Sequence, residues 1–281
     1  MQKRDNMRNI IVVSDTHCGC QFGLCPDKIQ IDAGGTYESS DPQKEVYKKW
    51  LEFWNEWVPH ITKNEPYIVV HNGDIVDGSH HNSVTQITHN LADQANIATL
   101  CMDPVLSAKK CKDYYHIRGT EVHVGQSGQD EERIAKRLGA IPNEAGNYSR
   151  HDLWLELGGK LIHFSHHIGT SSSSSYESTA VFKELVEAYN EAGRWHERPP
   201  DLLVRSHRHR AFKIEIPAEG GFAMSLVTPG WQLITPFVWR LASGRASTPQ
   251  IGGYLIRSGD EDGLYTRGKI WKTGRSKTII L

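Results

Sequence analysis

The sequence predicts a layered α/β fold on three observations. Short apolar runs alternate with amphipathic segments along most of the chain. Each run leads into polar or glycine-containing sequence, as buried strands do when they end in functional loops. With 281 residues, 38% of them hydrophobic, the chain is long enough for one domain with a substantial core. The expected strands span residues 10–13, 67–70, 114–117, 160–164, 202–204 and 222–227.

The strongest helical pattern spans residues 42–60, where bulky apolar side chains recur at helical spacing. We expect Asp41 to cap this helix, and Pro42 suits the first helical position because its missing N–H costs nothing there. Further helices are expected over residues 91–112, 130–138 and 176–192. Gly193 is expected to end the last of them.

Two long polar segments are predicted to be loops, namely residues 19–40 and the serine run 171–175. Both follow strands whose ends carry candidate ligands, so we expect them to wall the site. Residues from about 241 to 281 are rich in Gly, Ser and Arg, and are interpreted as a C-terminal extension. The chain is therefore predicted to be a single domain, 1–281, with a motif-bearing core over about 8–240.

Charge and cysteine content exclude several classes of protein. The charges of the 32 Lys and Arg nearly cancel those of the 33 Asp and Glu. We therefore do not expect a protein that binds nucleic acid through the electrostatic field of its whole surface. No apolar run approaches the ~18 residues that span a bilayer, so no membrane association is expected. The five cysteines are odd in number and unevenly spaced, which is typical of reduced thiols and predicts a cytoplasmic protein.

Residue types that bind metals follow five successive predicted strands. In chain order they are Asp15 and His17, Asp74, Glu121 and His123, His166, and His207 and His209. Any one of these motifs is weak evidence, but five in order at carboxyl ends of strands indicate one site, because ligands bind at that edge of an open α/β sheet. Carboxylate and imidazole ligands suit Mn²⁺, Fe or Zn²⁺.

The spacing of these residues suits two ions. Asp15 and His17 are two residues apart, so in extended chain their side chains point to the same side. His207 and His209 repeat this geometry, and each can reach a different ion. Asp74, after the tight turn at Gly73, can bridge both ions with its two oxygens. Two divalent ions ~3.5–4 Å apart would clamp a phosphate and activate water.

The order D-x-H, G-D-x-x-D, a glycine turn with His, H and then H-x-H resembles the calcineurin-like metallophosphoesterases, over residues 10–209. The resemblance implies a four-layer β-sandwich flanked by helices, and hydrolysis of phosphate esters with two divalent ions, with manganese favoured and iron or zinc as alternatives. For the first metal it implies the ligands Asp15, His17, Asp74 and His209. For the second it implies Asp74, His166 and His207.

The third motif departs from the family pattern G-N-H-[DE]. Here the run is Gly119-Thr120-Glu121-Val122-His123, without Asn. Either Glu121 replaces the Asn as a metal ligand and His123 is the leaving-group acid, or Thr120 takes the ligand position. We favour Glu121 because a carboxylate binds a divalent ion better than a hydroxyl does. His167 rivals His166 as a ligand, and the family spacing favours His166.

Four further residues are weighed as neighbours of the site. Arg118 and Arg208 are candidate phosphate-binding residues, with ion pairing to acidic loops as an equal alternative. His81 is a candidate substrate contact, although exposed loop histidines are common. Asp77 is expected to hydrogen-bond and orient a ligand rather than bind a metal.

The sequence therefore predicts a dinuclear metal-dependent phosphoesterase. A histidine in the third motif favours esters with poor leaving groups, which points to a phosphodiesterase acting on a nucleotide or a nucleic acid. The alternatives are a phosphomonoesterase for protein or small-molecule substrates, and a catalytically weak scaffold of the same fold that binds a partner protein.

Overall fold

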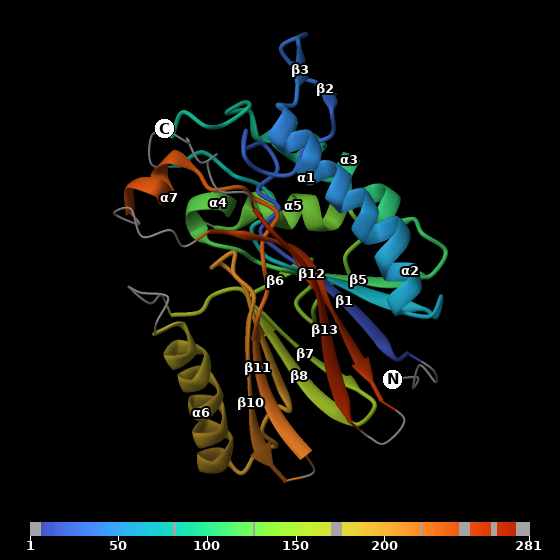
Figure 1. The fold of residues 1–281 in the computed structure, drawn as a ribbon, viewed down its shortest axis with the longest axis vertical. Helices are drawn as coiled ribbons and strands as arrows, with labels where there is room; N and C mark the ends of the chain where they lie inside the picture. The colour runs from blue at the N-terminus through green and yellow to red at the C-terminus, as the bar shows by residue number, and fades with distance from the viewer. Residues whose placement is uncertain are drawn as a thin grey trace, which may run out of the picture.

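The computed structural model describes residues 7–80, 83–125, 127–169, 176–219, 221–241, 248–259 and 263–273. Two β-sheets pack face to face, and helices cover the outer face of each sheet (Figure 1). The predicted four-layer β-sandwich flanked by helices is confirmed. No helix in the described part of the chain combines the length and the apolar character that crossing a membrane requires.

The first sheet has six strands in the order β13-β12-β1-β4-β5-β6. These are β1 (Asn9–Val13), β4 (Tyr67–Asn72), β5 (Cys111–Ile117), β6 (Ser149–Arg150), β12 (Gln250–Ser258) and β13 (Leu264–Lys272). The strands β1, β4, β5 and β6 run parallel, whereas β12 is antiparallel to both of its neighbours. The segment interpreted as an extension thus supplies β12, which lies beside β1 within the sheet.

The second sheet has five strands in the order β10-β11-β9-β8-β7. These are β7 (Asp152–Leu157), β8 (Lys160–Ser165), β9 (Leu202–Arg205), β10 (Phe212–Ala218) and β11 (Gly221–Val227). β9 runs parallel to β8 and to β11, while both edge strands are antiparallel to their neighbours. The carboxyl ends of β8 and β9 therefore point the same way, which lets their loops meet.

The two faces of β1 serve two different cores, because side chains alternate along a strand. Ile10 and Val12 pack between the sheets with apolar residues of the second sheet such as Phe164. Ile11 and Val13 face the opposite way, into the core under the helices. This double burial explains why the strand reads as an unbroken apolar run.

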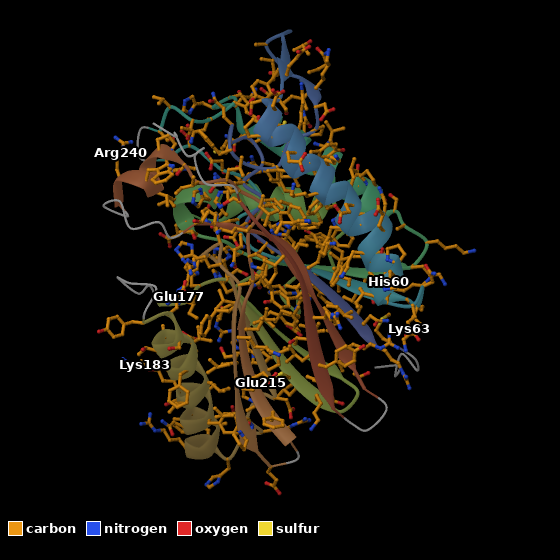
Figure 2. All side chains as sticks on the ribbon, in the orientation of Figure 1. His60, Lys63, Glu177, Lys183, Glu215 and Arg240 are labelled. Carbon is orange, nitrogen blue, oxygen red and sulfur yellow. The ribbon has the colours of Figure 1, made fainter. Side chains whose placement is uncertain are left out.

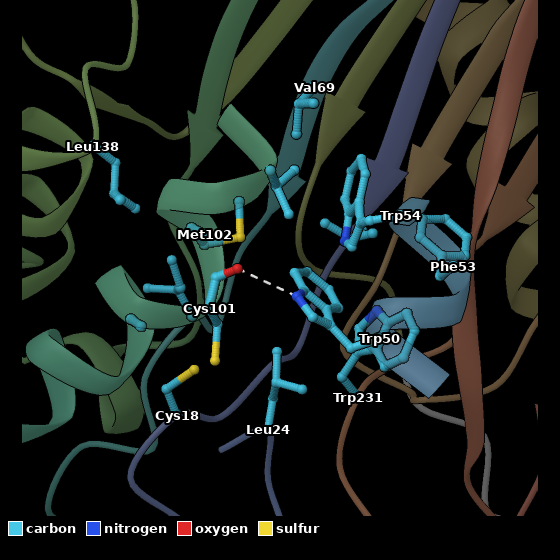
Figure 3. Packing of buried hydrophobic residues seen from close by; sticks show 14 of the residues in the cluster. Cys18, Leu24, Trp50, Phe53, Trp54, Val69, Cys101, Met102, Leu138 and Trp231 are labelled. Atoms are coloured by element: carbon cyan, nitrogen blue, oxygen red, sulfur yellow. Dashed lines mark hydrogen bonds between the residues drawn. The ribbon is translucent and has the colours of Figure 1, made fainter. Parts of the chain in front are cut away.

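The helical layer on the first sheet comprises α1 (Asp41–Glu52), the π-helical η1 (Phe53–Trp57), α2 (Val58–Ile61), α3 (Leu91–Leu106), α4 (Glu121–Val124) and α5 (Gln129–Arg137). The buried indole of Trp50 donates a hydrogen bond to the carbonyl oxygen of Cys101 at 3.2 Å, which fastens α1 to α3 (Figure 3). On the other side of the molecule, Leu185 of α6 (Glu177–Trp195) packs on Leu203 and Ala223 of the second sheet.

Several expected boundaries differ from those observed. Ser40, not Asp41, caps α1, since its side chain accepts a hydrogen bond from the backbone N–H of Gln43. The helix expected over residues 91–112 ends at Leu106, and β5 has begun by Cys111. Helix α6 runs through Gly193 and ends where His196 adopts a left-handed conformation.

The segment 19–40, expected to be a loop, contains a hairpin. Its strands are β2 (Lys28–Gln30) and β3 (Thr36–Glu38), which form a separate two-stranded sheet. The hairpin projects from the helical end of the molecule (Figure 1). The serine run 171–175 lies outside the described residues.

Candidate metal centre

The loops that leave the parallel strands are tied to one another by backbone hydrogen bonds. The N–H of Asp15 donates to the carbonyl of Gly73 at 2.9 Å, and that of His17 donates to the carbonyl of Asp74 at 3.1 Å. The loops after β1 and β4 are therefore held in register. The predicted ligands of these two motifs lie side by side as a result.

The second sheet brings its own loops to the same edge. The N–H of Ser206 donates to the carbonyl of His166 at 2.9 Å, which joins the loops after β8 and β9. Asn72 links the sheets, because its amide donates to Ser206 Oγ at 2.6 Å and to the carbonyl of Ser165 at 3.1 Å. The loops of four of the motifs thus converge where the two sheets meet.

Asp15, His17 and His209 form the first group, and one potential ligand atom of each lies within 4.8 Å of the others. Nε2 of His209 lies 3.1 Å from Nε2 of His17 and 3.3 Å from Oδ1 of Asp15. Asp15 is fully buried, yet its Oδ1 accepts no hydrogen bond. A buried carboxylate oxygen without a hydrogen bond, facing two imidazoles, fits a cation.

Asp74, His166 and His207 form the second group. Nε2 of His166 lies 3.0 Å from Oδ2 of Asp74, and Nδ1 of His207 lies 3.9 Å from the same oxygen. Nδ1 of His166 lies 2.6 Å from the carbonyl oxygen of Asn72, so Nε2 is the nitrogen that faces the group. Nε2 of His166 is also 3.9 Å from Oδ1 of Asp15, which places the two groups next to each other.

Asp74 adjoins both groups. It belongs to a further set with His17 and His123, whose potential ligand atoms also lie within 4.8 Å of one another. This location between the two groups is the one that a bridging carboxylate needs. His167, by contrast, lies in none of the groups found among the described residues.

The predicted ligands adopt an uncommon backbone conformation. Positive φ angles between 42° and 70° occur at Asp15, His17, Asp74, His207 and His209. Residues other than glycine seldom adopt such angles, and they cluster at functional sites where the surrounding structure supports the strain. The conformation turns each side chain out of the strand direction, which a sequence pattern based on extended chain does not anticipate.

The groups are strongly coupled electrostatically. Burial alone would raise the pKa of Asp15, but the charges of His209 and His166 outweigh it and lower the pKa below its usual value. Burial alone would lower the pKa of His166, but Asp74 and Asp15 outweigh it and raise the pKa to about 10. The carboxylates thus attract protons to the imidazoles, and the same negative charge would attract divalent cations.

The donor set fits two divalent ions of the kind that oxygen and nitrogen ligands favour. No cysteine belongs to any of the groups found in the described part of the chain. Burial raises the pKa of Cys20 and that of Cys25 to about 12, so both thiols remain protonated. The cysteines that follow the first motif are buried free thiols, as the sequence suggested.

In the third motif the structure places Thr120, and not Glu121, beside the predicted ligands. The hydroxyl of Thr120 lies 3.2 Å from Oδ2 of Asp74 and 3.1 Å from Nδ1 of His207. Glu121 begins α4 with an exposed side chain, and it belongs to none of the described groups. The structure therefore brings Thr120 to the predicted ligands and does not bring Glu121 there, although the sequence pattern favoured Glu121.

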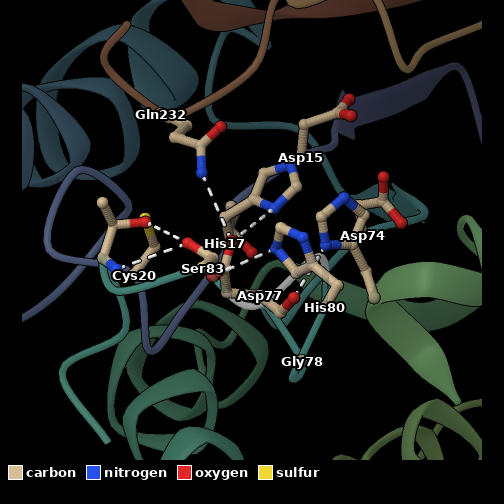
Figure 4. A network of polar contacts seen from close by, with 12 residues as sticks. Asp15, His17, Cys20, Asp74, Asp77, Gly78, His80, Ser83 and Gln232 are labelled. Atoms are coloured by element: carbon tan, nitrogen blue, oxygen red, sulfur yellow. Dashed lines mark hydrogen bonds and ion pairs between the residues drawn. The ribbon is translucent and has the colours of Figure 1, made fainter. Parts of the chain in front are cut away.

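Asp77 contacts a predicted ligand, as expected. Oδ1 of Asp77 lies 3.4 Å from Nδ1 of His17, and the amides of Gln86 and Gln232 point to the two oxygens of the same carboxylate (Figure 4). Nε2 of His80 lies 3.5 Å from Oδ2 of this carboxylate. Asp77 therefore holds His17 with Nε2 turned towards the first group.

His123 lies beside this network. Its Nδ1 is 2.7 Å from the carbonyl oxygen of Asp77, so Nδ1 carries the proton and donates it. Burial and the neighbouring His17 lower the pKa of His123 to about 4. The neutral ring therefore presents Nε2 as a hydrogen-bond acceptor, and action as an acid requires a second proton on this nitrogen.

A cavity of about 400 Å³ opens beside the predicted ligands. His17, Asp74, His123, His207 and His209 contribute to its wall. The remaining wall comes from residues 83–85, from Val122 and from a segment that includes α7 (Pro236–Leu241).

Residues 19–40 do not line this cavity, contrary to expectation. The hairpin within that segment projects beyond α1 (Figure 1). Thr235, Val238 and Arg240 form part of the wall instead, and no motif in the sequence marks them. Their only signal is that they follow a strand of the second sheet, as the ligand-bearing loops do.

The two arginines predicted to contact the substrate, Arg118 and Arg208, do not line the cavity. Arg118 donates from Nη2 to Ser149 Oγ at 2.9 Å, and does not line the cavity. Arg208 donates from Nη1 to the carbonyl of Glu177 at 3.4 Å and is likewise absent from the wall. Figure 2 shows Glu177 at the start of α6. His81 lies outside the described residues.

Comparisons with solved structures give low similarity over nearly the whole chain. A hypothetical protein from Thermus thermophilus is 10% identical, with 95% of this chain and 100% of that chain covered and a TM-score of 0.43. A metallophosphoesterase from Sphaerobacter thermophilus is 9% identical, with coverages of 96% and 90% and a TM-score of 0.38. Vps29 from Chaetomium thermophilum is 11% identical, with coverages of 94% and 98% and a TM-score of 0.38.

No curated protein matches the sequence. A family model does match: that of the calcineurin-like phosphoesterases, over residues 8–119. The matched segment contains the first two motifs and the glycine that opens the third, and thus Asp15, His17 and Asp74 at the centre described above. By this match, residues 8–119 are similar to the calcineurin-like phosphoesterases.

Proposed function

We propose that this protein hydrolyses phosphodiesters, of a nucleotide or a nucleic acid, with the help of two divalent metal ions. The observation that carries the proposal is the pair of adjoining groups with Asp74 between them, beside an open cavity. Such a pair can hold two ions close enough to act on one phosphate. Manganese suits the oxygen and nitrogen donors, and iron and zinc are alternatives.

The residues divide into those that hold the ions and those that orient the ligands. Asp15, His17 and His209 hold the first ion, His166 and His207 hold the second, and Asp74 contributes to both. Bound divalent ions supply Lewis acidity at the phosphate. Asp77 fixes the ring of His17, and Thr120 lies between Asp74 and His207, where its hydroxyl takes the place of the family Asn.

His123 is proposed to handle the proton of the leaving group. It lines the cavity with Nε2 free of the hydrogen bond that occupies Nδ1. Protonated on Nε2, it would donate to the departing oxygen, and a poor leaving group gains most from such help. This preference supports diesters with alkoxide leaving groups.

The size and lining of the cavity support a nucleotide-sized substrate. About 400 Å³ is within the range of small-molecule sites. Val84, Val122 and Val238 give the wall an apolar part, against which a base or another flat group would pack. Arg240 is the one lysine or arginine among the described lining residues, whereas tight binding to a polymer takes many phosphate contacts.

The deciding experiment measures metal content and turnover together. Protein loaded with Mn²⁺ is assayed on bis-p-nitrophenyl phosphate, p-nitrophenyl phosphate, cyclic nucleotides and a single-stranded oligonucleotide, with Asp74→Asn as control. We expect two ions per chain and faster turnover of diesters. Faster turnover of the monoester would favour a phosphomonoesterase. Fewer than two ions and no turnover would favour a scaffold that binds a partner protein.

A further inference from the structure

Glu131 is a fully buried carboxylate in the first turn of α5, outside the predicted metal-binding motifs. Its two oxygens accept hydrogen bonds from the backbones of two different loops. Oε1 accepts from the N–H of Ile75 at 3.1 Å, and Oε2 accepts from the N–H of Gly119 at 2.6 Å. Oε1 is also 3.5 Å from Nε2 of the buried His116. A single side chain thus connects the loop after β4 to the loop after β5.

The two N–H groups belong to the neighbours of two residues at the centre. Ile75 follows Asp74, and Gly119 precedes Thr120. The N–H of Thr120 donates to Oδ1 of Asp74 at 2.7 Å, so the loops also touch on the side that faces the centre. The fit is close, because a Cβ on Gly119 would lie 2.1 Å from the same oxygen.

We infer that Glu131 is a positioning residue, which sets the separation between Asp74 and Thr120 and thereby the shape of the second metal site. The inference rests on the metal centre proposed above. The hydrogen bonds that Glu131 makes within the described part of the chain go to backbone N–H groups and not to a predicted ligand side chain. Glu131 therefore acts on Asp74 and Thr120 through the backbones of their two loops, as outer hydrogen-bond partners act on metal ligands.

A carboxylate suits this position because it offers acceptors on both of its oxygens. Glutamine offers one oxygen and one NH₂ group, so one of the two backbone N–H groups would face another donor. An unpaired buried donor carries the full desolvation penalty, and the loop that bears it would shift to find another partner. A shift of either loop changes the distance between Asp74 and Thr120.

Contacts behind Glu131 extend to the loop after β1. The rings of His116 and His71 stack in parallel with 5.3 Å between centroids, and Nε2 of His71 lies 3.2 Å from Oγ1 of Thr16. Thr16 lies between the predicted ligands Asp15 and His17. The buried layer beneath the centre is therefore continuous across three of the ligand-bearing loops.

The same helix offers a matched control. Glu132 also accepts backbone hydrogen bonds with both oxygens, from the N–H of Tyr148 at 2.8 Å and from the N–H of Ser149 at 2.7 Å. These groups lie at the start of β6, which pairs with the end of β5, and neither of them belongs to a residue next to a predicted ligand. Glu132→Gln therefore removes a similar backbone contact without affecting the second site.

The test is a titration of the metal-free protein with Mn²⁺. Calorimetry and electron paramagnetic resonance measure the binding of each ion. Wild type is expected to bind two ions. Glu131→Gln is expected to bind one of them about 10–100-fold more weakly, as is typical when an outer partner of a ligand is lost. Glu132→Gln is expected to bind both as wild type does. The thermal midpoint of each metal-free variant shows whether the two changes destabilise the fold alike.

Each outcome has a distinct meaning. Wild type that binds fewer than two ions would overturn the proposed function itself. Wild type with two ions and an unchanged affinity in Glu131→Gln would overturn the positioning role alone. So would equal losses of affinity in both variants, since the effect would then follow general stability. Should Glu131→Gln fail to fold, Glu131→Asp keeps both oxygens on a shorter side chain; unchanged Mn²⁺ binding there would overturn the inference.

Discussion

Thr120 gives both of its hydrogen-bond donors to one carboxylate, that of Asp74. The backbone N–H lies 2.7 Å from Oδ1, and the hydroxyl lies 3.2 Å from Oδ2. Both oxygens of Asp74 are therefore oriented by a single residue of the next motif. The orientation of a bridging carboxylate decides which ion each oxygen can reach, so Thr120 has a structural role that does not depend on metal binding of its own.

Asp74→Asn keeps the shape of the side chain but removes the charge between the two groups. We expect loss of at least one ion per chain and a loss of turnover beyond the about 10–100-fold that outer partners of ligands typically cost. Folding should persist, since the backbone contacts of this loop remain. Metal analysis, turnover and circular dichroism measure the three effects. An active, fully metallated variant would contradict a dinuclear centre.

Thr120→Val removes the hydroxyl while preserving the size of the side chain. We expect about 10–100-fold weaker binding of the second ion, in line with the loss of a hydrogen bond to a charged group, worth about 1.5–3 kcal/mol. Glu121→Gln is the matched comparison and should bind Mn²⁺ as wild type does, because its side chain is exposed. The reverse ranking of affinities would restore Glu121 as the ligand.

His123→Ala should retain both ions and lose turnover selectively. General acid catalysis typically raises the rate about 10²–10⁴-fold. The loss of rate should be largest for esters with alkoxide leaving groups. Hydrolysis that releases p-nitrophenolate should change little, because this leaving group needs no proton. Rates on a series of diesters with graded leaving groups measure the difference. A uniform loss across the series would assign His123 to binding of the phosphate.

We expect His163 to make the folded protein less stable in acid. Burial and the nearby Arg205 lower the pKa of His163 to about 4 in the folded state, from an ordinary value of 6.5. The unfolded chain therefore takes up a proton that the folded protein excludes. The contribution of His163 to stability is complete above pH 6.5, and it is lost as the pH falls from 6.5 towards 4.

Denaturant unfolding at several pH values tests this expectation. The free energy of unfolding should fall less steeply below pH 6.5 in His163→Gln than in wild type. His60→Gln, at an exposed helical position, should follow the wild-type curve. Parallel curves for all three proteins would show that His163 titrates normally in the folded state.

The sequence predicted the buried strands well because each is a short apolar run between polar turns. Ile10 to Val13 is such a run, and β1 spans Asn9–Val13. Strand β10 escaped prediction because its side chains alternate between partly buried and exposed, from Phe212 to Ala218, as an edge strand requires. The placement of β12 beside β1 depends on pairing between distant segments, which no local pattern reveals.

The candidate site was predicted as far as residue type and order could define it. The set Asp15, His17, Asp74, His166, His207 and His209, which comes from four of the five motifs, lies together as the order of the motifs implied. Glu121 does not join these groups, because it lies at the start of α4, a turn that the strength of a carboxylate as a ligand does not reveal. Glu131 and Val238 could not be found, since a single buried glutamate on one helix and a single valine on another short helix belong to no pattern of spacing.

The pairing of β1 with β12 has a consequence for biosynthesis. Ile10 is among the first residues of the fold to leave the ribosome, and its partner Ile256 is among the last. The nascent chain can pair β1 with β4 early, but the other edge of β1 stays bare until Gln250–Ser258 has been translated. A bare, apolar strand edge is prone to mispairing with other chains. The yield of correctly assembled protein should therefore depend on how quickly β12 is made, and on how well the edge of β1 is protected until then.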